Sequence, residues 1–473
     1  MVSLEYIAFE HNNAAAELVK LAYDTPPLAF VHSYGCQQNV NDGERIKGVL
    51  MDIGYGLCDK PEDADLILFN TCAVREHAEQ RVFGNVGALK GLKEKKHGLI
   101  IGLCGCMANQ KHVVEKLRQS YPYVDLVFGV DGIDTLPQLI AQKLQKHKRV
   151  LMEPAQRPVI VENIPIRRES EFRAWLPIMY GCDNFCTYCI VPYVRGREKS
   201  RKPGDILAEF KSLVEAGYKE ITLLGQNVNS YGKGLEEQVD FSDLLNLLCT
   251  VPGDYHIRFM TSHPKDASFK LIDTIAAQPK ICKHLHLPVQ CGSDRLLVQM
   301  NRHYTVEHYL ELIEYARKKV PGITFSSDII VGFPGETEEQ YAELCDFVKT
   351  VRFDRLGCFA YSAEENTVAA KMPNQIDEET KQRRADHIME LQAEVSAERE
   401  GEKVGHTYEC ICDGVDDETG MYLLRTKADC PEIDGNVLTP ADTPLETGAF
   451  YKVTITDSDT YDLYGYAEER LED

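Results

Sequence analysis

The sequence lacks the features that mark membrane and secreted proteins. Across its 473 residues, no run reaches the roughly 18 uncharged apolar residues that a membrane-spanning helix requires. Glu5 stands where a secretory signal would be basic, so we expect a cytoplasmic protein with no membrane partner. No internal repeat or low-complexity tract is evident, and 44% apolar with 27% charged residues are ordinary globular values.

Positive charge is also scarce. The chain has 52 Lys and Arg against 74 Asp and Glu, a net charge of -22. Residues 402–473 alone hold 18 acidic and 5 basic side chains, so this segment carries -13 of that charge. Bulk electrostatics therefore cannot hold a polyanion, and any RNA partner must meet a local basic patch.

Hydrophobic periodicity divides the chain into an α/β protein of several domains. After an extension over residues 1–27, residues 28–150 alternate apolar runs with amphipathic stretches, which predicts an open parallel α/β sheet. Residues 151–170 hold three prolines and no sustained period, which is typical of a linker. The strand runs expected in the sheet are FVHSYG, LILFNT, LIIGLCG and LVFGV.

Residues 171–401 repeat the alternation, and the last segment changes period. Six strand runs separated by helical stretches predict a partial (β/α)6 barrel, and a polar helix over residues 376–401 follows it. In residues 402–473 the period becomes two, with short runs divided by Gly, Asp and Pro, as in a small all-β barrel. The six expected barrel strands are WLPIMYG, KEITLLGQ, HIRFM, HLHLPV, ITFSSDIIVGF and RLGCFAYS.

Three cysteines on one short loop give the most specific chemical signal. GCDNFCTYC places Cys182, Cys186 and Cys189 in a C-x-x-x-C-x-x-C arrangement directly after the first strand of the partial barrel. Iron-sulfur clusters are normally held by four thiolates, so three leave one iron open to a substrate. The alternative, a structural zinc site, usually needs a fourth ligand and a second paired motif.

A second group of cysteines follows successive strands of the first domain. Cys36, Cys72 and Cys106 each end a strand run, and parallel strands present such ends at one sheet edge. We therefore expect a second three-thiolate site there, against the alternative that each is a small buried side chain. Cys104 should lie within its strand, and Cys104, Cys291 and Cys358 are predicted not to be ligands.

These motifs carry a resemblance to known enzymes. The three-cysteine loop and the six-unit barrel resemble the radical S-adenosylmethionine superfamily. The motifs between residues 30 and 345 resemble the methylthiotransferase family, in the tRNA branch that methylthiolates isopentenylated adenosine beside the anticodon. They are YGCQQN, NTCAVRE, CGCMA, YGCDNFCTYCIVPYVRGRE, TLLGQNVNSYG, RFMTSHP, HLHLPVQCGSD, MNRHYT and DIIVGFPGET.

The resemblance implies cofactors and partners. It implies an auxiliary 4Fe-4S cluster on Cys36, Cys72 and Cys106 and a radical 4Fe-4S cluster on the loop cysteines. It also implies two S-adenosylmethionine molecules per turnover, a tRNA anticodon stem-loop as substrate, and an electron donor such as flavodoxin or ferredoxin. Five polar residues at strand ends resemble residues that line the cofactor pocket, although each can instead have a structural role. They are Gln226, Asn227, Arg258, Ser262 and Gln290.

The sequence supports two candidate substrates. FDRLGCFAYSAEENTVAAKMPNQIDEE, RTKADCPEIDGNVL and TYDLYGYAEE resemble the sister branch, which methylthiolates an aspartate of a small-subunit ribosomal protein. An acidic C-terminal barrel, similar to a TRAM domain, fits a basic ribosomal protein better than RNA. The cavity over the cluster sets the chemistry, however, so we favour tRNA. We expect a basic run to contact the RNA, although such a run can also be simply a solvated positive face. Its residues are Arg195, Arg197, Lys199, Arg201 and Lys202.

Overall fold

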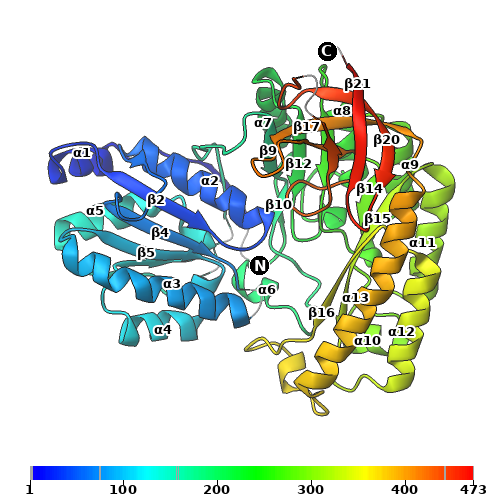
Figure 1. Cartoon of the computed structure of the whole chain (residues 1–473). Coiled ribbons are helices and arrows are strands. Elements are labelled where there is room, and N and C mark those ends of the chain that lie inside the picture. The colour runs from blue at the N-terminus through cyan, green and yellow to red at the C-terminus, as the bar shows by residue number, and fades with distance from the viewer. Residues whose placement is uncertain (1–3, 74–75, 156, 158, 441–443, 472–473) are drawn as a thin grey trace.

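The protein is described by a computed structural model covering residues 4–73, 76–155, 157, 159–440 and 444–471. Three folded units follow one another along the chain, coloured blue to cyan, green to yellow and orange to red in Figure 1. In the described part of the chain, no helix is long and apolar enough to cross a membrane. The expectation of an α/β protein with a separate all-β C-terminal barrel is confirmed.

The N-terminal domain is a six-stranded parallel sheet in the order β3-β2-β4-β5-β6-β7. Every residue of its central strands β4 and β5 is buried, because helices cover both faces of the sheet. The strands are β2 (Leu28–Ser33), β3 (Gly56–Leu57), β4 (Leu66–Thr71), β5 (Ile100–Gly105), β6 (Leu126–Phe128) and β7 (Val150–Leu151). The helices are α2 (Gln37–Asp52), α3 (Glu76–Lys95), α4 (Lys111–Ser120) and α5 (Leu136–Lys146), with short η1 (Met107–Asn109) and η2 (Val130–Gly132).

The extension and the linker contact each other. Strand β1 (Glu5–Ala8) pairs in parallel with β8 (Val159–Glu162), which lies inside the expected linker. Helix α1 (Asn13–Ala22) packs against α5, and its buried Val19 joins the core of the N-terminal domain. The linker is therefore partly ordered by a strand that its proline content did not indicate.

The catalytic barrel contains all six expected strands. They form two parallel three-stranded sheets, β13-β12-β9 and β14-β15-β16, joined by a bridge between Ile257 and Ile281. The strands are β9 (Arg173–Pro177), β12 (Glu220–Leu224), β13 (His256–Phe259), β14 (His284–His286), β15 (Thr324–Val331) and β16 (Arg355–Ala360). The helices are α6 (Val191–Val194), α7 (Pro203–Glu215), α8 (Phe241–Cys249), α9 (Phe269–Ala277), α10 (Asp294–Gln299), α11 (Val306–Lys319) and α12 (Glu338–Val351). Short elements are β10 (Met179–Tyr180), β11 (Lys199–Ser200), η3 (Val228–Ser230), η4 (Pro264–Asp266) and η5 (Ala369–Lys371).

The polar helix closes the barrel. Helix α13 (Glu378–Gly401) lies along β16, and its Ala385 and Ile388 enter the core of the catalytic barrel. Helix α12 before it begins at a capping box, in which Thr337 and Gln340 satisfy each other's backbone groups. Two apolar positions of α13 therefore complete the barrel wall, and three of its charged residues, Lys381, Arg384 and Glu400, are also buried.

The C-terminal domain is a closed five-stranded barrel in the order β17-β18-β19-β21-β20. It is fixed to the catalytic barrel by the Glu220 ion cluster, which we define as Glu220, Arg258, Asp413 and Arg425. The Glu220 carboxylate is 1% exposed and accepts hydrogen bonds from Arg258 at 2.9 Å and Arg425 at 2.7 Å. The strands are β17 (Thr407–Val415), β18 (Tyr422–Thr426), β19 (Val437–Thr439), β20 (Phe450–Ser458) and β21 (Leu463–Arg470).

Candidate functional site: two cysteine triads

The auxiliary triad, Cys36, Cys72 and Cys106, lies at the carboxyl edge of the N-terminal sheet. These residues follow β2, β4 and β5, which are adjacent strands. Gly35 turns at a φ of +112°, and a Cβ there would lie 2.5 Å from the Cβ of Cys72, so the backbone approaches this cysteine closely. Burial raises the pKa of Cys106 to about 12, and the neighbouring thiols of Cys72 and Cys36 add to the shift. The expected convergence at one edge is observed.

Cys36 has a second feature that suits a ligand. It is the N-cap of α2, a 16-residue helix, and its side chain is exposed at the sheet edge. Its thiol is therefore accessible to a group bound at this edge.

Cys104 is buried within its strand. It lies within β5, as expected, and packs in the apolar core between the sheet and its helices. Its thiol is 3.6 Å from the carbonyl oxygen of Phe69. Cys106 lies just beyond β5, where the chain turns into η1, and it packs with Ala73, Ile190 and Val194 at the sheet edge.

The loop triad, Cys182, Cys186 and Cys189, follows β10 in the catalytic barrel. Burial raises the pKa of Cys182 to about 11 and that of Cys189 to about 12, and the nearby Cys186 thiol raises both further. The loop is held by Asn301, whose side-chain amide donates to the carbonyl oxygen of Asn184 at 3.0 Å. The three thiols therefore face one another on a fixed loop.

The spacing of both triads distinguishes a cluster from a single ion. A single tetrahedral zinc with Zn–S bonds of about 2.3 Å draws its sulfurs to about 3.7 Å from each other. Among the described residues, neither triad brings its three sulfurs within 4.8 Å of one another. Three thiols with a wider separation fit a 4Fe-4S group, with its fourth iron left for another ligand. The zinc alternative therefore fits these sites less well.

The two triads are joined by a small apolar cluster. Ala73 and Cys106 of the N-terminal domain pack against Ile190 and Val194, which directly follow the loop triad. The side-chain amide of Asn109 donates to the carbonyl oxygen of Val194 at 2.7 Å. The sheet edge of one domain thus faces the cysteine loop of the other. Val74 and Arg75 of the NTCAVRE motif lie outside the described residues.

Side chains of the expected basic run are largely buried. Our prediction that this run contacts RNA is corrected accordingly. Arg195 is 6% exposed and donates to Asp42 at 2.8 Å and Asn39 at 3.0 Å, both on α2. Arg201 is 2% exposed, donates to the carbonyl oxygen of Pro177 at 2.7 Å and pairs with Glu162.

The other basic side chains differ in exposure. The Lys199 ammonium donates to the carbonyl oxygen of Arg157 at 3.0 Å, so it too is engaged inside the protein. Arg197 has an exposed side chain, paired with Asp183 at 2.7 Å, and Lys202 is exposed with its ammonium over the Tyr6 ring. Of the five side chains in the run, Arg197 and Lys202 are therefore the two that are exposed to a partner.

Buried polar atoms without partners lie at the strand ends where the sequence predicts a cofactor pocket. Asn227 is 1% exposed, and its Oδ1 has no hydrogen-bond partner, while its amide donates to Asp266 at 2.7 Å. The Ser262 hydroxyl and the His263 Nε2 are also buried and unpartnered. Burying polar atoms in this state is costly unless a ligand satisfies them, so they fit a polar cofactor such as S-adenosylmethionine.

Gln226 and Gln290 also end strands, whereas Arg258 does not face this pocket. Gln226 is half-buried after β12, and Gln290 is buried at a φ of 70° beside β15. Arg258 belongs to the Glu220 ion cluster and donates to the carbonyl oxygen of Lys427 in the C-terminal barrel at 3.1 Å. Its prediction as a cofactor-binding residue is therefore wrong, because two domains already use its guanidinium.

Two residues of the site were not singled out in the sequence. Arg302 is 4% exposed, and its guanidinium lies 3.5 Å from the Cys186 sulfur while donating to the carbonyl oxygen of Pro288. Burial lowers the pKa of His263 to about 2, with Arg302 adding to the shift, so this imidazole is neutral. Their signals were present in the MNRHYT and RFMTSHP motifs, but residue type alone did not separate them from structural residues.

Comparisons with known proteins identify the families that this chain matches. The Radical SAM superfamily matches residues 176–348, Uncharacterized protein family UPF0004 matches residues 29–129, and the TRAM domain matches residues 404–467. The radical S-adenosylmethionine methyltransferase TsrM of Kitasatospora setae, solved with cobalamin and a [4Fe-4S] cluster, has a TM-score of 0.51 at 14% identity. The alignment covers 71% of this chain and 75% of that one. The fold and the cysteine loop define a radical S-adenosylmethionine enzyme.

Sequence relatives give the family. The tRNA-2-methylthio-N(6)-dimethylallyladenosine synthase of Thermoanaerobacter pseudethanolicus is 51% identical, covering 81% of this chain and 82% of the relative. That of Carboxydothermus hydrogenoformans is 44% identical, covering 92% and 98%. The chain therefore belongs to the methylthiotransferase family, in the branch of these tRNA enzymes. Its cofactors are accordingly 4Fe-4S clusters and S-adenosylmethionine.

Proposed function

We propose that the protein methylthiolates N6-isopentenyladenosine next to the tRNA anticodon. The observation that carries this proposal is the meeting of two cysteine triads, from two domains, across the cluster of Ala73, Cys106, Ile190 and Val194. The relatives named for this reaction support it, and the relative that covers 92% of the chain extends the similarity into the C-terminal barrel. An aryl C–H bond is unreactive, so a radical centre and a sulfur source must act on one bound base.

The two cysteine triads would hold different clusters. Cys182, Cys186 and Cys189 would hold the radical cluster, and Cys36, Cys72 and Cys106 the auxiliary cluster. When bound, these clusters and two S-adenosylmethionine molecules per turnover supply the methyl group, the sulfur and the radical that turn C–H into C–S.

The surrounding side chains orient the cofactor and exclude water. Asn227 and Ser262 are placed to hydrogen-bond S-adenosylmethionine, since each has a buried oxygen without a partner. The Nδ1 of neutral His263 accepts from the Lys265 N–H, so its Nε2–H can donate a hydrogen bond there without adding charge to the pocket. The Arg302 guanidinium beside Cys186 places a fixed positive charge next to the cluster thiolates. These groups are buried, so the radical step is shielded from bulk water.

The partners follow from the same reaction. A reductant such as flavodoxin or ferredoxin must deliver the electron that starts each radical step. The TRAM domain and exposed Arg197 and Lys202 are the candidates for contact with the anticodon stem-loop. The stem-loop must reach the space between the two triads, since the reacting base has to meet both clusters.

The ribosomal-protein reaction is the second candidate, favoured by one observation. The C-terminal segment carries a net charge of -13, which suits a basic protein better than RNA. Deleting that segment is a poor test, because it strips Glu220 and Arg258 of their partner Arg425 and of the Lys427 carbonyl.

The direct experiment presents both substrates to the intact holoenzyme. Reconstituted protein, reductant and S-adenosylmethionine are incubated anaerobically with an isopentenylated anticodon stem-loop or with the ribosomal protein, and products are identified by mass spectrometry. We expect a methylthio group on the adenosine and an unmodified ribosomal protein. Modification of the ribosomal protein alone would overturn the proposal in favour of the second candidate. A stem-loop lacking the isopentenyl group is the matched control.

A further inference from the structure

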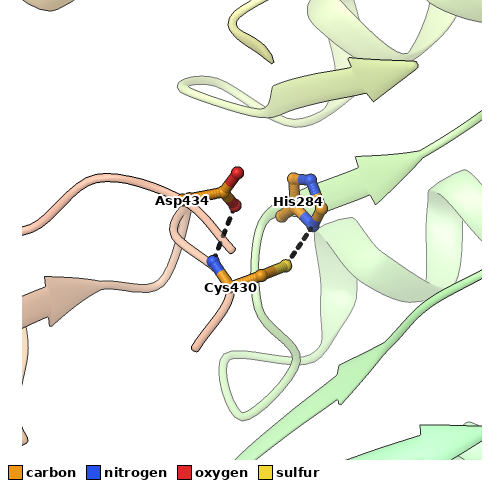
Figure 2. A group of neighbouring side chains, drawn as sticks. All are labelled: His284, Cys430 and Asp434. Atoms are coloured by element: carbon orange, nitrogen blue, oxygen red, sulfur yellow. Dashed lines mark hydrogen bonds between the residues drawn. The ribbon is translucent and has the colours of Figure 1, made fainter. Parts of the chain in front are cut away.

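A third group of metal-ligating side chains lies between the catalytic barrel and the C-terminal barrel. His284 at the start of β14 faces Cys430 and Asp434, which belong to the loop between β18 and β19 of the C-terminal barrel (Figure 2). Their donor atoms all lie within 4.8 Å of one another, and the Cys430 sulfur is 3.7 Å from the His284 Nδ1. Two ligands of one zinc ion, at bonds of about 2.0 and 2.3 Å, are separated by about 3.5 Å. The geometry is therefore compact enough for a single ion, unlike either triad.

The histidine is held in the tautomer that a metal needs. The His284 Nε2 is 2.7 Å from the Ser326 hydroxyl oxygen, and that hydroxyl is 2.9 Å from the Nδ1 of His286. Ser326 accepts the Nε2–H of His284 and donates its own proton to His286, which satisfies all three groups. The Nδ1 lone pair of His284 is then free to face Cys430. An oxygen partner on the remote ring nitrogen is the usual support of a metal-bound histidine.

The charged groups around the site have a net negative charge that a bound cation would neutralise. Asp429, Asp434 and Glu400 pair with the cations Arg355 and Lys403, and Arg258 of the Glu220 ion cluster also lies close enough to act on both aspartates. Three carboxylates against two cations leave one negative charge, and the neighbouring Glu220 ion cluster is balanced within itself. Ionising the cysteine would add a second negative charge. A divalent cation would neutralise both, and buried charges are stable only when compensated.

The Cys430 sulfur has two further close neighbours. The Arg258 guanidinium lies 3.9 Å from this sulfur. The thioether of Met260 lies 3.3 Å from the same sulfur and is a further soft donor. A thiolate, an imidazole and a carboxylate together form a donor set typical of zinc.

We propose that His284, Cys430 and Asp434 bind one Zn²⁺ that ties the C-terminal barrel to the catalytic barrel. On binding, the zinc–sulfur bond replaces the S–H bond, and the proton passes to solvent. The ligands come from two domains, so the ion acts as a clamp that holds the C-terminal barrel in register with the catalytic barrel. This site is separate from the iron-sulfur chemistry and does not depend on which substrate the enzyme modifies.

The test measures zinc in the reconstituted holoenzyme. The protein is titrated anaerobically with zinc sulfate in the presence of a competing chelator, and zinc and iron are counted by mass spectrometry. We expect about one zinc per chain, and X-ray absorption at the zinc edge should show one sulfur at about 2.3 Å with nitrogen and oxygen at about 2.0 Å.

Variants separate this site from adventitious zinc. Cys430→Ala and His284→Gln should lose the zinc while keeping their iron. Cys412→Ala is the matched control, because Cys412 is a buried cysteine of the same barrel that is not part of the compact group. Zinc retained by Cys430→Ala, or a wild-type spectrum with three sulfur neighbours, would place the ion in a triad and overturn the proposal. So would wild-type protein that holds no zinc, and this result needs no variant to fold.

Discussion

Replacing Arg195 by leucine should release the N-terminal domain from the catalytic barrel. Its guanidinium is 6% exposed and joins the cysteine loop to α2 through Asp42 at 2.8 Å and Asn39 at 3.0 Å. Leucine fills part of the same space but leaves Asp42, itself 4% exposed, as a buried carboxylate without its cation. Breaking a buried pair on one side costs about 3 to 5 kcal/mol.

The fluorescence of the tryptophan can report whether this interface is intact. Trp175 is the one tryptophan of the sequence, is 8% exposed on β9, and its carbonyl oxygen accepts a hydrogen bond from Asn41 of α2 at 3.3 Å. In an anaerobic urea titration followed by tryptophan emission, a slope of about 3 kcal/mol per M converts the loss into a midpoint lower by about 1 to 1.7 M.

The double variant is the matched control. Arg195→Leu with Asp42→Leu removes both charges, and apolar replacement of a whole buried pair is often neutral. The double variant should therefore recover most of the stability that the single variant loses, which gives a large coupling energy in the cycle. A single variant as stable as the wild type, or a double variant that is worse than the single one, would refute the assignment of Arg195 to this interface.

Three further outcomes follow from the site and the domain interface. Cys106→Ala should lose half the iron and Cys104→Ala none, and the reverse result would show that the wrong member of the pair was chosen. Ser262→Ala should keep its iron but weaken S-adenosylmethionine binding about 5- to 10-fold in equilibrium dialysis, as expected for one lost hydrogen bond; unchanged affinity would remove Ser262 from the pocket. Lowering the pH from about 7.5 to about 5 should lower the Tm, because burial depresses the pKa of His256 below 6.5 and the unfolded chain alone takes up the proton. His256→Gln should flatten this pH dependence in thermal scans, and an unaltered slope would contradict it.

Much of the fold could be predicted because its signals are local. Each strand of the catalytic barrel is a short apolar run bounded by turns, so periodicity located all six. Strands β8 and β21 were not predicted: β8 lies among prolines, and β21 ends in exposed charged residues with few apolar positions to reveal its period. Both are stabilised mainly by pairing with distant segments, which a local pattern does not contain.

The cysteines could be predicted, but the roles of the charged residues could not. Thiols at successive strand ends meet at one sheet edge whatever the loops do, so topology alone brings Cys36, Cys72 and Cys106 together. Whether an arginine is exposed depends on which carboxylates the tertiary fold places opposite it. The partners of Arg195 and Arg258 include Asp42 and Glu220, which are 153 and 38 residues away in the chain.

The separate roles of the two triads are tested most directly by a triple variant of the auxiliary triad, with Cys36, Cys72 and Cys106 all changed to alanine. Anaerobic reconstitution should load about eight irons per wild-type chain, four for each cluster, and about four in the variant. The variant should still cleave S-adenosylmethionine reductively, because the loop triad is intact, but it should transfer no methylthio group to the stem-loop. Full iron content or retained methylthiolation in this variant would contradict the account of two clusters with separate tasks.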